Sequence, residues 1–360
     1  MRNRWQMLAF IALTLVAVPA VGDEGRIPIF AAPTVIAAPG KYFVTRNLAI
    51  AAGSLITITA DDVDIDLNGF VLTSTAAAPV ITATGVNGVT IRNGTVIGGS
   101  SNLRVNTGTR IVIEGVQVVG ATGPSGAGIL LEDCTQFAIR RVVAREDQAD
   151  GIDVLNGLTV PEAEGTIADS LIEGSANAIF VQTSPGVGRS SVSILNNRLE
   201  SSVFNGIIYL AGEGCLIAGN SISASSLSGM YLATYRCTVR DNVVTANPQA
   251  GGSGILEEGD DNLILNNVVA NAGGLGFEIS GDRNYVEANV ANKNGSFGFK
   301  FAGVGNIYRR NMARGNAGVP GGLCPAPCSP DLCVSPVGAA TATSAGDNFL
   351  PGPPTFPACN

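Results

Sequence analysis

The chain has 360 residues, of which 46% are apolar, 14% are charged and 46 are glycine, and its formal net charge is −8 at pH 7. This apolar content excludes a disordered chain, because the Val, Ile and Leu side chains must be buried. The acidic balance argues against nucleic acid and anionic lipid as partners, and it disfavours polyuronates unless a cation bridges them. The sequence contains no histidine, which excludes Ser-His-Asp and Cys-His catalysis and removes the commonest zinc and copper ligand.

Residues 1–22 have the pattern of an export signal peptide. Arg2 and Arg4 give a basic start, residues 8–18 are apolar, and Ala-Val-Gly at 20–22 is a small-residue cleavage site. The apolar stretch is shorter than the roughly 20 residues that span a bilayer, so we expect cleavage rather than anchoring. The mature protein is therefore expected to be secreted or periplasmic and free of the membrane.

Residues 23–54 precede the regular part of the chain. They contain Pro28, Pro33 and Pro39 and then an apolar run at 42–44. A solenoid needs its open ends covered, so we expect this segment to be an N-terminal cap.

Residues 55–316 repeat with a period of 22 to 28 residues. One recurring element is an Asn in a short apolar frame, as in Ser-Ile-Leu-Asn-Asn-Arg-Leu at 193–199. Equivalent frames are centred on Asn220, Asn242, Asn267, Asn289 and Asn311. Because Asn tolerates a left-handed backbone, we expect these residues to make the sharp turns between strands.

The other recurring element is a small residue followed by apolar, variable and apolar residues, which is typical of a strand with one buried face. It occurs at residues 128–131, 151–154, 178–181, 206–209, 229–232, 276–279 and 298–301. Such short strands cannot bury their apolar side chains alone, so neighbouring periods must stack. We therefore predict an all-β solenoid, a parallel β-helix of about eleven coils.

Three frames carry a family resemblance: Asp-Ile-Asp-Leu-Asn-Gly-Phe-Val-Leu at 64–72, Gly-Asp-Asp-Asn-Leu-Ile-Leu-Asn-Asn-Val-Val at 259–269 and Gly-Asp-Arg-Asn-Tyr-Val-Glu-Ala-Asn-Val at 281–290. They resemble the right-handed β-helix repeat proteins, which include the periplasmic NosD-like group and the pectin-lyase-like carbohydrate-processing enzymes. The resemblance extends over about residues 55–316 and implies a single-stranded, right-handed parallel β-helix. It implies no particular activity, since this fold carries lyases, hydrolases, epimerases and adhesins.

The sequence lacks residues and motifs on which the known activities of these proteins depend. It lacks the Asn-Thr-Asp and Gly-His-Gly motifs of polygalacturonase-like members, and it presents no unpaired Arg of the kind that pectate lyases use. A copper-delivery role would require His or Met ligands, and the mature chain has only Met230 and Met312.

Residues 317–360 form a tail rich in Cys and Pro. Its four cysteines are Cys324, Cys328, Cys333 and Cys359. In an exported protein these predict two disulfides in one of three pairings, and a metal site is the alternative interpretation.

Cys215 and Cys237 are 22 residues apart and hold the same position before their apolar frames. They should lie on adjacent coils at a separation that permits a disulfide, and two stacked thiols are the alternative. Cys134 is the odd cysteine, and we expect it to pack in the core.

Outward positions on the Asn-bearing strands carry alternating charges, at Asp66, Arg92, Glu114, Arg140, Glu287 and Arg309. An Arg in such a row would suit an acidic sugar, but each has a carboxylate neighbour, so we favour cross-strand ion pairs. Asp62, Asp64 and Asp66 share one outward face, which raises the alternative of calcium. Alternate strand residues are nearly 7 Å apart, however, so we expect no metal site and no cofactor.

The best catalytic candidates are Asp260 and Asp282, which occupy the same turn of adjacent coils, with Glu258 beside them. Their carboxyl groups would approach the separation of about 5 Å that retaining glycosidases use. The alternative is structural, because Asp favours such turns and Arg283 falls beside Asp261.

A row of outward apolar residues is the best binding candidate: Phe180, Ile208, Tyr231 and Leu256. The rings of Phe180 and Tyr231 would form a sugar-binding platform, with Asp150 and Asp153 supplying polar contacts at one end. Alternatively a loop or the tail covers the row. We therefore predict an exported β-helix protein that binds glycan or a cell-surface component, with a carboxylate-dependent polysaccharide hydrolase or lyase, or a structural rod, as the alternatives.

Overall fold

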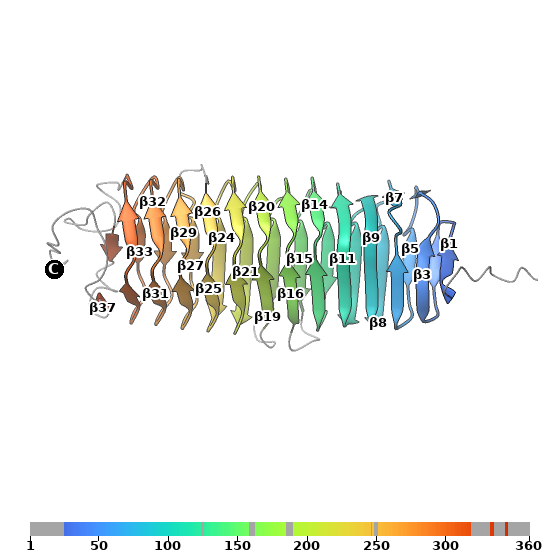
Figure 1. Ribbon diagram of the computed structural model, residues 1–360, viewed down its shortest axis with the longest axis horizontal. Coiled ribbons are helices and arrows are strands. Elements are labelled where there is room, and N and C mark those ends of the chain that lie inside the picture. Colours follow the sequence, from blue (N-terminus) through green and yellow to red (C-terminus); the bar gives the residue numbers. More distant parts are fainter. Residues whose placement is uncertain are drawn as a thin grey trace, which may run out of the picture.

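The computed structural model describes residues 25–123, 126–157, 163–184, 190–245, 247 and 251–317, together with the backbone of residues 332–334 and 343–344. These residues form a rod in which successive turns of the chain lie side by side along one axis (Figure 1). Each turn contributes one strand to each of three rows, and all pairings between turns are parallel, as in the register of Ile255 with Phe277.

One row is a 13-stranded sheet, here sheet B. It consists of β2 (Thr34–Ile36), β5 (Ile56–Ile58), β8 (Ile81–Asn87), β10 (Leu103–Thr109), β12 (Ile129–Glu132), β15 (Ile152–Asn156), β18 (Ile179–Thr183), β21 (Ile207–Glu213), β24 (Met230–Tyr235), β27 (Ile255–Glu257), β30 (Phe277–Ile279), β33 (Phe299–Phe301) and β36 (Leu332–Val334).

The other two rows form a single 24-stranded sheet, here sheet A, because the long strands β9 and β11 run through both. The first row holds β1 (Ile27–Ile29), β3 (Gly40–Val44), β6 (Val63–Asp66), β9 (Val89–Gly98), β11 (Ile111–Val119), β13 (Phe137–Arg140), β16 (Glu164–Ala168), β19 (Ser191–Leu195), β22 (Leu216–Ala218), β25 (Thr238–Arg240), β28 (Leu263–Leu265), β31 (Tyr285–Glu287), β34 (Ile307–Arg309) and β37 (Thr343–Ser344). The second row adds β4 (Leu48–Ile50), β7 (Val71–Ser74), β14 (Val143–Arg145), β17 (Leu171–Glu173), β20 (Arg198–Glu200), β23 (Ser221–Ser223), β26 (Val243–Thr245), β29 (Val268–Ala270), β32 (Val290–Asn292) and β35 (Met312–Arg314).

The strands are short because one face of each points into a narrow core. Inward residues such as Ile255, Phe277 and Ile279 are fully buried, and each such side chain stabilises the fold by about 1.5–3 kcal/mol. Near the C-terminal end, the rings of Phe277 and Phe299 stack with their centroids 4.8 Å apart. This alternation of inward apolar and outward variable residues is the pattern expected from the sequence.

The repeated Asn residues stabilise the turns with their side chains. Each side-chain amide donates to the side-chain oxygen of the next Asn along the rod, at 2.9–3.1 Å. The ladder consists of Asn197, Asn220, Asn242, Asn267, Asn289 and Asn311, and all six are buried. Stacked amides satisfy buried polar groups that would otherwise cost about 1–3 kcal/mol each.

The expectation that the ladder Asn residues adopt the left-handed backbone is wrong. The left-handed φ, between 54° and 69°, falls on the residue before each of them. These residues are Asn196, Gly219, Asp241, Asn266, Ala288 and Arg310. In each turn, one residue adopts the left-handed backbone and the Asn that follows it supplies the side chain of the ladder. Because the left-handed residue contributes only its backbone, Ala288 and Arg310 can also occupy that position.

The solenoid is slightly longer than predicted, with about twelve turns. Strands β1 to β4 lie within residues 23–54, and β1, β2 and β4 pair in parallel with later strands. The first turn thus lies inside the segment expected to be a cap. At the other end, β36 and β37 pair with β33 and β34, so the tail contributes strands as well.

Candidate functional site

Outward residues of sheet B align in one column along the rod. Strand register places one residue of each turn directly over the next. The central column consists of Arg104, Leu130, Asp153, Phe180, Ile208, Tyr231, Leu256, Glu278 and Lys300. Its middle is the apolar stripe (Phe180, Ile208, Tyr231 and Leu256), whose four residues lie on adjacent strands as the sequence period predicts.

The apolar stripe is more enclosed than a fully exposed platform. Ile208 is 9% exposed, and Phe180, Tyr231 and Leu256 are half-buried. The Tyr231 hydroxyl donates a hydrogen bond to Glu258 at 2.8 Å, and this bond raises the pKa of Tyr231. Glu258 therefore orients the ring of Tyr231.

Asp153 is the most unusual residue of the central column. It lies between Leu130 and Phe180 on the neighbouring strands, and it is 8% exposed although it points outward. Its Oδ1 atom has no hydrogen-bond partner among the described residues. Desolvation, with smaller contributions from Asp150 and Glu132, raises its pKa to about 8. Asp153 is therefore mainly protonated at pH 7, and it can donate a proton or a hydrogen bond.

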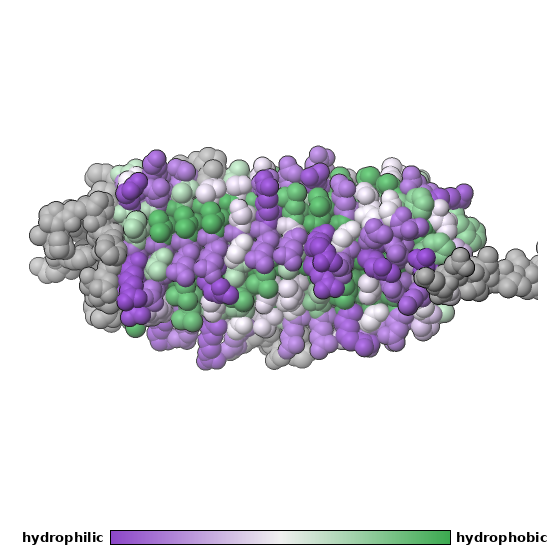
Figure 2. Space-filling view, viewed as in Figure 1, coloured by the Kyte–Doolittle hydropathy of each residue, from purple (hydrophilic) through white to green (hydrophobic). Residues whose placement is uncertain are grey.

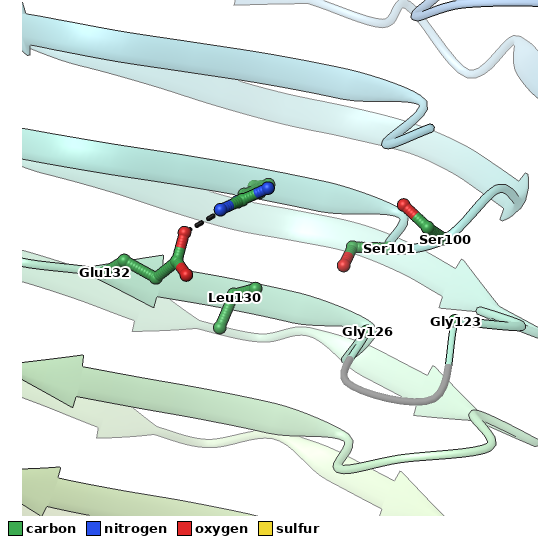
Figure 3. Close-up of a pocket in the computed structure, with 7 residues that line it drawn as sticks. Ser100, Ser101, Gly123, Gly126, Leu130 and Glu132 are labelled. Atoms are coloured by element: carbon green, nitrogen blue, oxygen red, sulfur yellow. Dashed lines mark hydrogen bonds and ion pairs between the residues drawn. The ribbon is translucent and has the colours of Figure 1, made fainter. Parts of the chain in front are cut away.

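Next to Asp153, Arg104 and Glu132 form an ion pair, with Arg104 Nε 2.6 Å from Glu132 Oε2. The amide of Asn106 contacts the same oxygen at 3.4 Å. The two charged side chains border a pocket of about 230 Å³ that is also lined by Ser100, Ser101, Gly123, Gly126 and Leu130. Figure 3 shows Glu132 across the pocket from the Ser100 and Ser101 side chains. We call Arg104, Glu132 and Asp153 the polar end of the face.

Two further carboxylates near the polar end are engaged by the backbone. Asp150 accepts hydrogen bonds from the backbone N–H of Asn177 at 3.0 Å and from its side chain at 2.8 Å. Asp147 accepts one from the N–H of Ala121 at 2.9 Å, and burial raises its pKa to about 7. Asp147, Arg104 and Glu132 could not be identified from the sequence as site residues, and only the register between turns shows that Arg104 and Glu132 meet.

The predicted catalytic pair, Asp260 and Asp282, has its oxygens engaged by the backbone. Asp260 Oδ1 accepts the N–H of Asp282 at 2.8 Å, and Asp282 Oδ1 accepts the N–H of Val304 at 2.7 Å. Arg283 lies 2.8 Å from Asp261 and 3.4 Å from Asp260, and its hydrogen bond lowers the pKa of Asp261. These contacts support the structural interpretation of this acidic turn (Asp260, Asp261, Asp282 and Arg283).

The charged row on sheet A forms ion pairs between turns. Arg92 lies 3.1 Å from Asp64 and 3.6 Å from Asp66. Arg140 lies 2.8 Å from Glu114, and Arg309 lies 3.1 Å from Glu287. Asp62 contacts Arg110 at 3.3 Å. Within the described residues, no group of three or more His, Cys, Asp or Glu side chains is placed to hold a metal ion.

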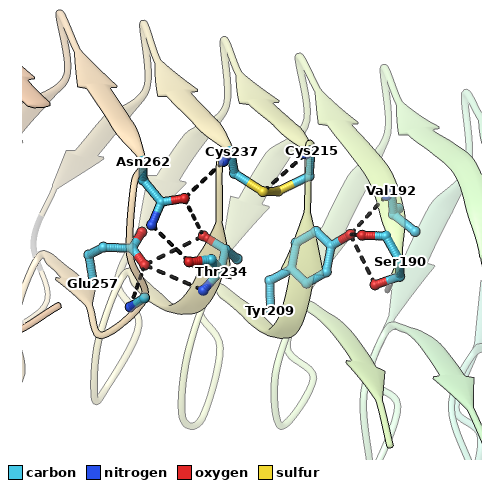
Figure 4. Close-up of a disulfide and its surroundings, with 9 residues drawn as sticks. Ser190, Val192, Tyr209, Cys215, Thr234, Cys237, Glu257 and Asn262 are labelled. Atoms are coloured by element: carbon cyan, nitrogen blue, oxygen red, sulfur yellow. Dashed lines mark hydrogen bonds between the residues drawn. A yellow bond between two sulfur atoms is a disulfide. The ribbon is translucent and has the colours of Figure 1, made fainter. Parts of the chain in front are cut away.

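Cys215 and Cys237 are joined by a disulfide, with their Cα atoms 4.6 Å apart (Figure 4). The N–H of Cys237 donates to Asn262 Oδ1, so the cysteines extend a row of stacked Asn residues. Cys134 is a buried free thiol whose pKa burial raises to about 12, in keeping with core packing. Three of the tail cysteines, Cys324, Cys328 and Cys359, lie outside the described residues, and only the backbone of Cys333 is described.

A buried Glu257 lies near the disulfide and was not identified from the sequence. It is fully buried beside Thr234, and the N–H of Gly259 donates to it at 2.9 Å (Figure 4). Burial raises its pKa to about 8. Glu257 points into the core from β27, so it does not belong to the outward face.

A second apolar row, also missed, runs along the second row of sheet A. Val243, Val268, Val290 and Met312 are in register, and the first and last are 41% and 42% exposed. Figure 2 shows a hydrophobic band towards the C-terminal end of one face of the rod.

Comparisons with known proteins concern the fold. Residues 186–324 match the family described as "Right handed beta helix region". The fold is a right-handed parallel β-helix. No curated protein matches the sequence. Within the described residues, no helix has the length and apolarity needed to cross a membrane.

Solved structures with similar folds include two enzyme modules and a phage protein. The A-module of mannuronan C-5 epimerase AlgE6 from Azotobacter vinelandii is 16% identical, with a TM-score of 0.63 and coverage of 88% of this chain and 92% of that one. The AlgE4 A-module gives 14% identity, a TM-score of 0.65 and coverage of 86% and 91%. Tailspike protein 3 of bacteriophage CBA120 gives 10% identity and a TM-score of 0.65, and the match covers 91% of this chain and 56% of that one. At these identities the likeness extends to the fold alone.

Proposed function

We propose that this β-helix is an exported protein that binds glycan along the outward face of sheet B. The observation that carries the proposal is the central column, in which the apolar stripe adjoins a polar end with a buried carboxyl group, Asp153, whose Oδ1 has no partner among the described residues. Sugar rings stack on aromatic faces through their C–H groups and hydrogen-bond through their hydroxyls, so a glycan suits an apolar row with polar groups at one end.

Further support comes from the orientation of Tyr231. Its ring is held by the hydrogen bond to Glu258, so little rotamer freedom is lost when a ligand stacks on it. The similar folds include mannuronan epimerase modules and a phage tailspike, and the first of these act on a polysaccharide by name.

Export rests on two features. Residues 1–22, which lie outside the described residues, read as a signal peptide. The Cys215–Cys237 disulfide suits an oxidising compartment such as the periplasm or the cell exterior.

The test is a glycan-array screen of the protein without residues 1–22, with and without calcium, followed by titration with any glycan that binds. Tyr231→Ala should weaken binding about fivefold, since a sugar that covers about 40 Å² of the ring gains about 1 kcal/mol. Tyr285→Ala is the matched control, because Tyr285 on sheet A also donates its hydroxyl to a glutamate, Glu287, at 2.8 Å. Equal losses in the two variants, or binding to no glycan, would leave the structural rod as the better account.

A further inference from the structure

We infer that Asp153 and Glu132 form an acid–base pair that hydrolyses a glycosidic bond of an uncharged glycan. The inference rests on the proposed function, because the apolar stripe supplies the binding site beside the pair. Neither residue of this pair belongs to the acidic turn.

Strand register places the two carboxyl groups on one surface. Glu132 pairs with Leu155, and Leu130 pairs with Asp153, so Glu132 is offset from Asp153 by one strand and two residues. With strands about 4.8 Å apart and about 3.3 Å per residue, the two Cα atoms are about 8 Å apart. A Cα separation of this size allows the two carboxyl groups to lie within the roughly 6.5–9.5 Å that leaves room for the water of an inverting glycosidase.

The two groups have opposite environments. Asp153 is more than nine-tenths buried and is held between two apolar side chains, and Oδ1 lacks a partner among the described residues. The Glu132 side chain is 25% exposed, and Arg104 balances its charge at 2.6 Å. Both polar contacts of Glu132 use Oε2, which leaves Oε1 to hold a water. One carboxyl is thus kept neutral and the other charged, the division of roles that acid–base hydrolysis requires.

The charges of the face select the class of glycan. The two cations of the central column are both paired, Arg104 with Glu132 and Lys300 with Glu278 at 2.7 Å. A uronate carboxylate would therefore find no unpaired cation in this column, and it would be repelled by Glu132. The pocket beside the pair presents the hydroxyls of Ser100 and Ser101 and small glycines, which suit the hydroxyls of a neutral sugar.

The proposed step is balanced by water alone. Asp153 donates its proton to the glycosidic oxygen as the bond between that oxygen and the anomeric carbon breaks. Glu132 removes a proton from a water molecule while the water oxygen bonds to the same carbon. The products are two shorter glycans, one with a new reducing end of inverted configuration, and proton exchange with solvent restores both carboxyl groups.

The experiment incubates the protein with neutral polysaccharides, such as a mixed-linkage glucan and a galactomannan, and with alginate and polygalacturonate. New reducing ends are counted, and proton NMR gives the configuration of the new anomeric carbon. Asp153→Asn and Glu132→Gln should each lower the rate at least about 100-fold while glycan binding is retained, and Asp153→Asn should be at least as stable to heat as the parent. The control is Glu114→Gln, which removes an ion-paired carboxylate from sheet A of a neighbouring turn and should leave the rate unchanged.

The outcomes separate the two proposals. Release of reducing ends from a neutral glycan, lost in both variants, supports the inference. Binding of a glycan without cleavage, cleavage of polyuronates alone, or cleavage that persists in Asp153→Asn overturns it and leaves glycan binding standing. Failure to bind any glycan removes the proposed function and the inference with it.

Discussion

Two groups of carboxylates on adjacent turns behave differently in this β-helix. In the acidic turn, Asp260 and Asp282 each accept a backbone N–H of the next turn, and Arg283 lies beside them. At the polar end of sheet B, Asp153 has an oxygen without a partner among the described residues, and its neighbours in the column are Leu130 and Phe180.

The difference shows where a solenoid can place chemistry. A turn must satisfy backbone donors that point along the rod, so a carboxylate there is used as an acceptor by the chain itself. The outward face of a strand has its backbone groups satisfied by the neighbouring strands, so a side chain there is not needed by the chain itself as an acceptor. Proximity of two Asp residues in adjacent turns is therefore a weaker sign of catalysis than an unsatisfied carboxyl on a sheet face.

The largest expected difference between the two regions is in the rate of glycan hydrolysis. Asp153→Asn should lower glycan hydrolysis by at least about 100-fold, the usual contribution of a general acid. The double variant Asp260→Asn, Asp282→Asn should cleave at the parent rate once folding is confirmed by circular dichroism. If the double variant were the inactive one, the acidic turn would be the catalytic site.

The dependence of hydrolysis on pH should follow the proton on Asp153. Since its pKa is raised to about 8, kcat/KM should fall about tenfold per pH unit above that value, as the acid loses its proton. Initial rates between pH 6 and 10 give the profile. A fall that begins near pH 5 would mean that Asp153 is ionised at neutral pH, and the assignment of the acid would be wrong.

The stability of the two regions should respond oppositely to pH. Burial raises the pKa of Asp153 in the folded state, so the folded protein binds the proton more tightly and loses stability as pH rises from about 4 to about 8. Asn does not titrate, so Asp153→Asn should be more stable than the parent by several kcal/mol at pH 9 and similar to it at pH 4. Urea unfolding at the two pH values measures the difference, and a variant that is less stable at pH 9 would refute the buried, unpaired carboxyl.

The smallest effect is expected in the acidic turn. Asp282→Ala removes the acceptor of the Val304 N–H and should destabilise the protein by about 1 kcal/mol at pH 7. Asp282→Asn keeps an acceptor oxygen and should recover most of the loss. Equal stability of the parent and Asp282→Ala would show that the turn does not depend on this bond.

Much of the fold could be predicted because the sequence repeats with a period of 22 to 28 residues. Residues such as Phe180 and Tyr231 recur at the same point of each turn, and a parallel solenoid must place them in register. The same spacing predicted that Cys215 and Cys237 lie on adjacent turns, where they form a disulfide. The role of the Asn ladder was misassigned, because the sequence does not distinguish a residue chosen for its backbone from one chosen for its side chain.

The polar end could not be predicted in full, because the burial and the ion pairing of its residues depend on side chains in other turns and not on the residue types themselves. Asp153 was considered as a polar contact, but its burial depends on Leu130 and Phe180 in other turns. Arg104 and Glu132 are 28 residues apart, and nothing in their local sequence marks them as partners. In contrast, Asp260 and Asp282 stood out at a regular 22-residue spacing, which is what a structural repeat produces.

The most direct test of this account is the titration of the Asp153 carboxyl group by carbon-13 NMR, in the free protein and with a bound neutral glycan, using Asp153→Asn to assign the signal. We predict that the free carboxyl titrates at about pH 8 and that the glycan shifts this value, while the Asp282 signal is unchanged by the glycan. A titration of Asp153 near 4, the ordinary value for Asp, or a glycan effect confined to Asp282, would contradict the placement of the functional site on sheet B.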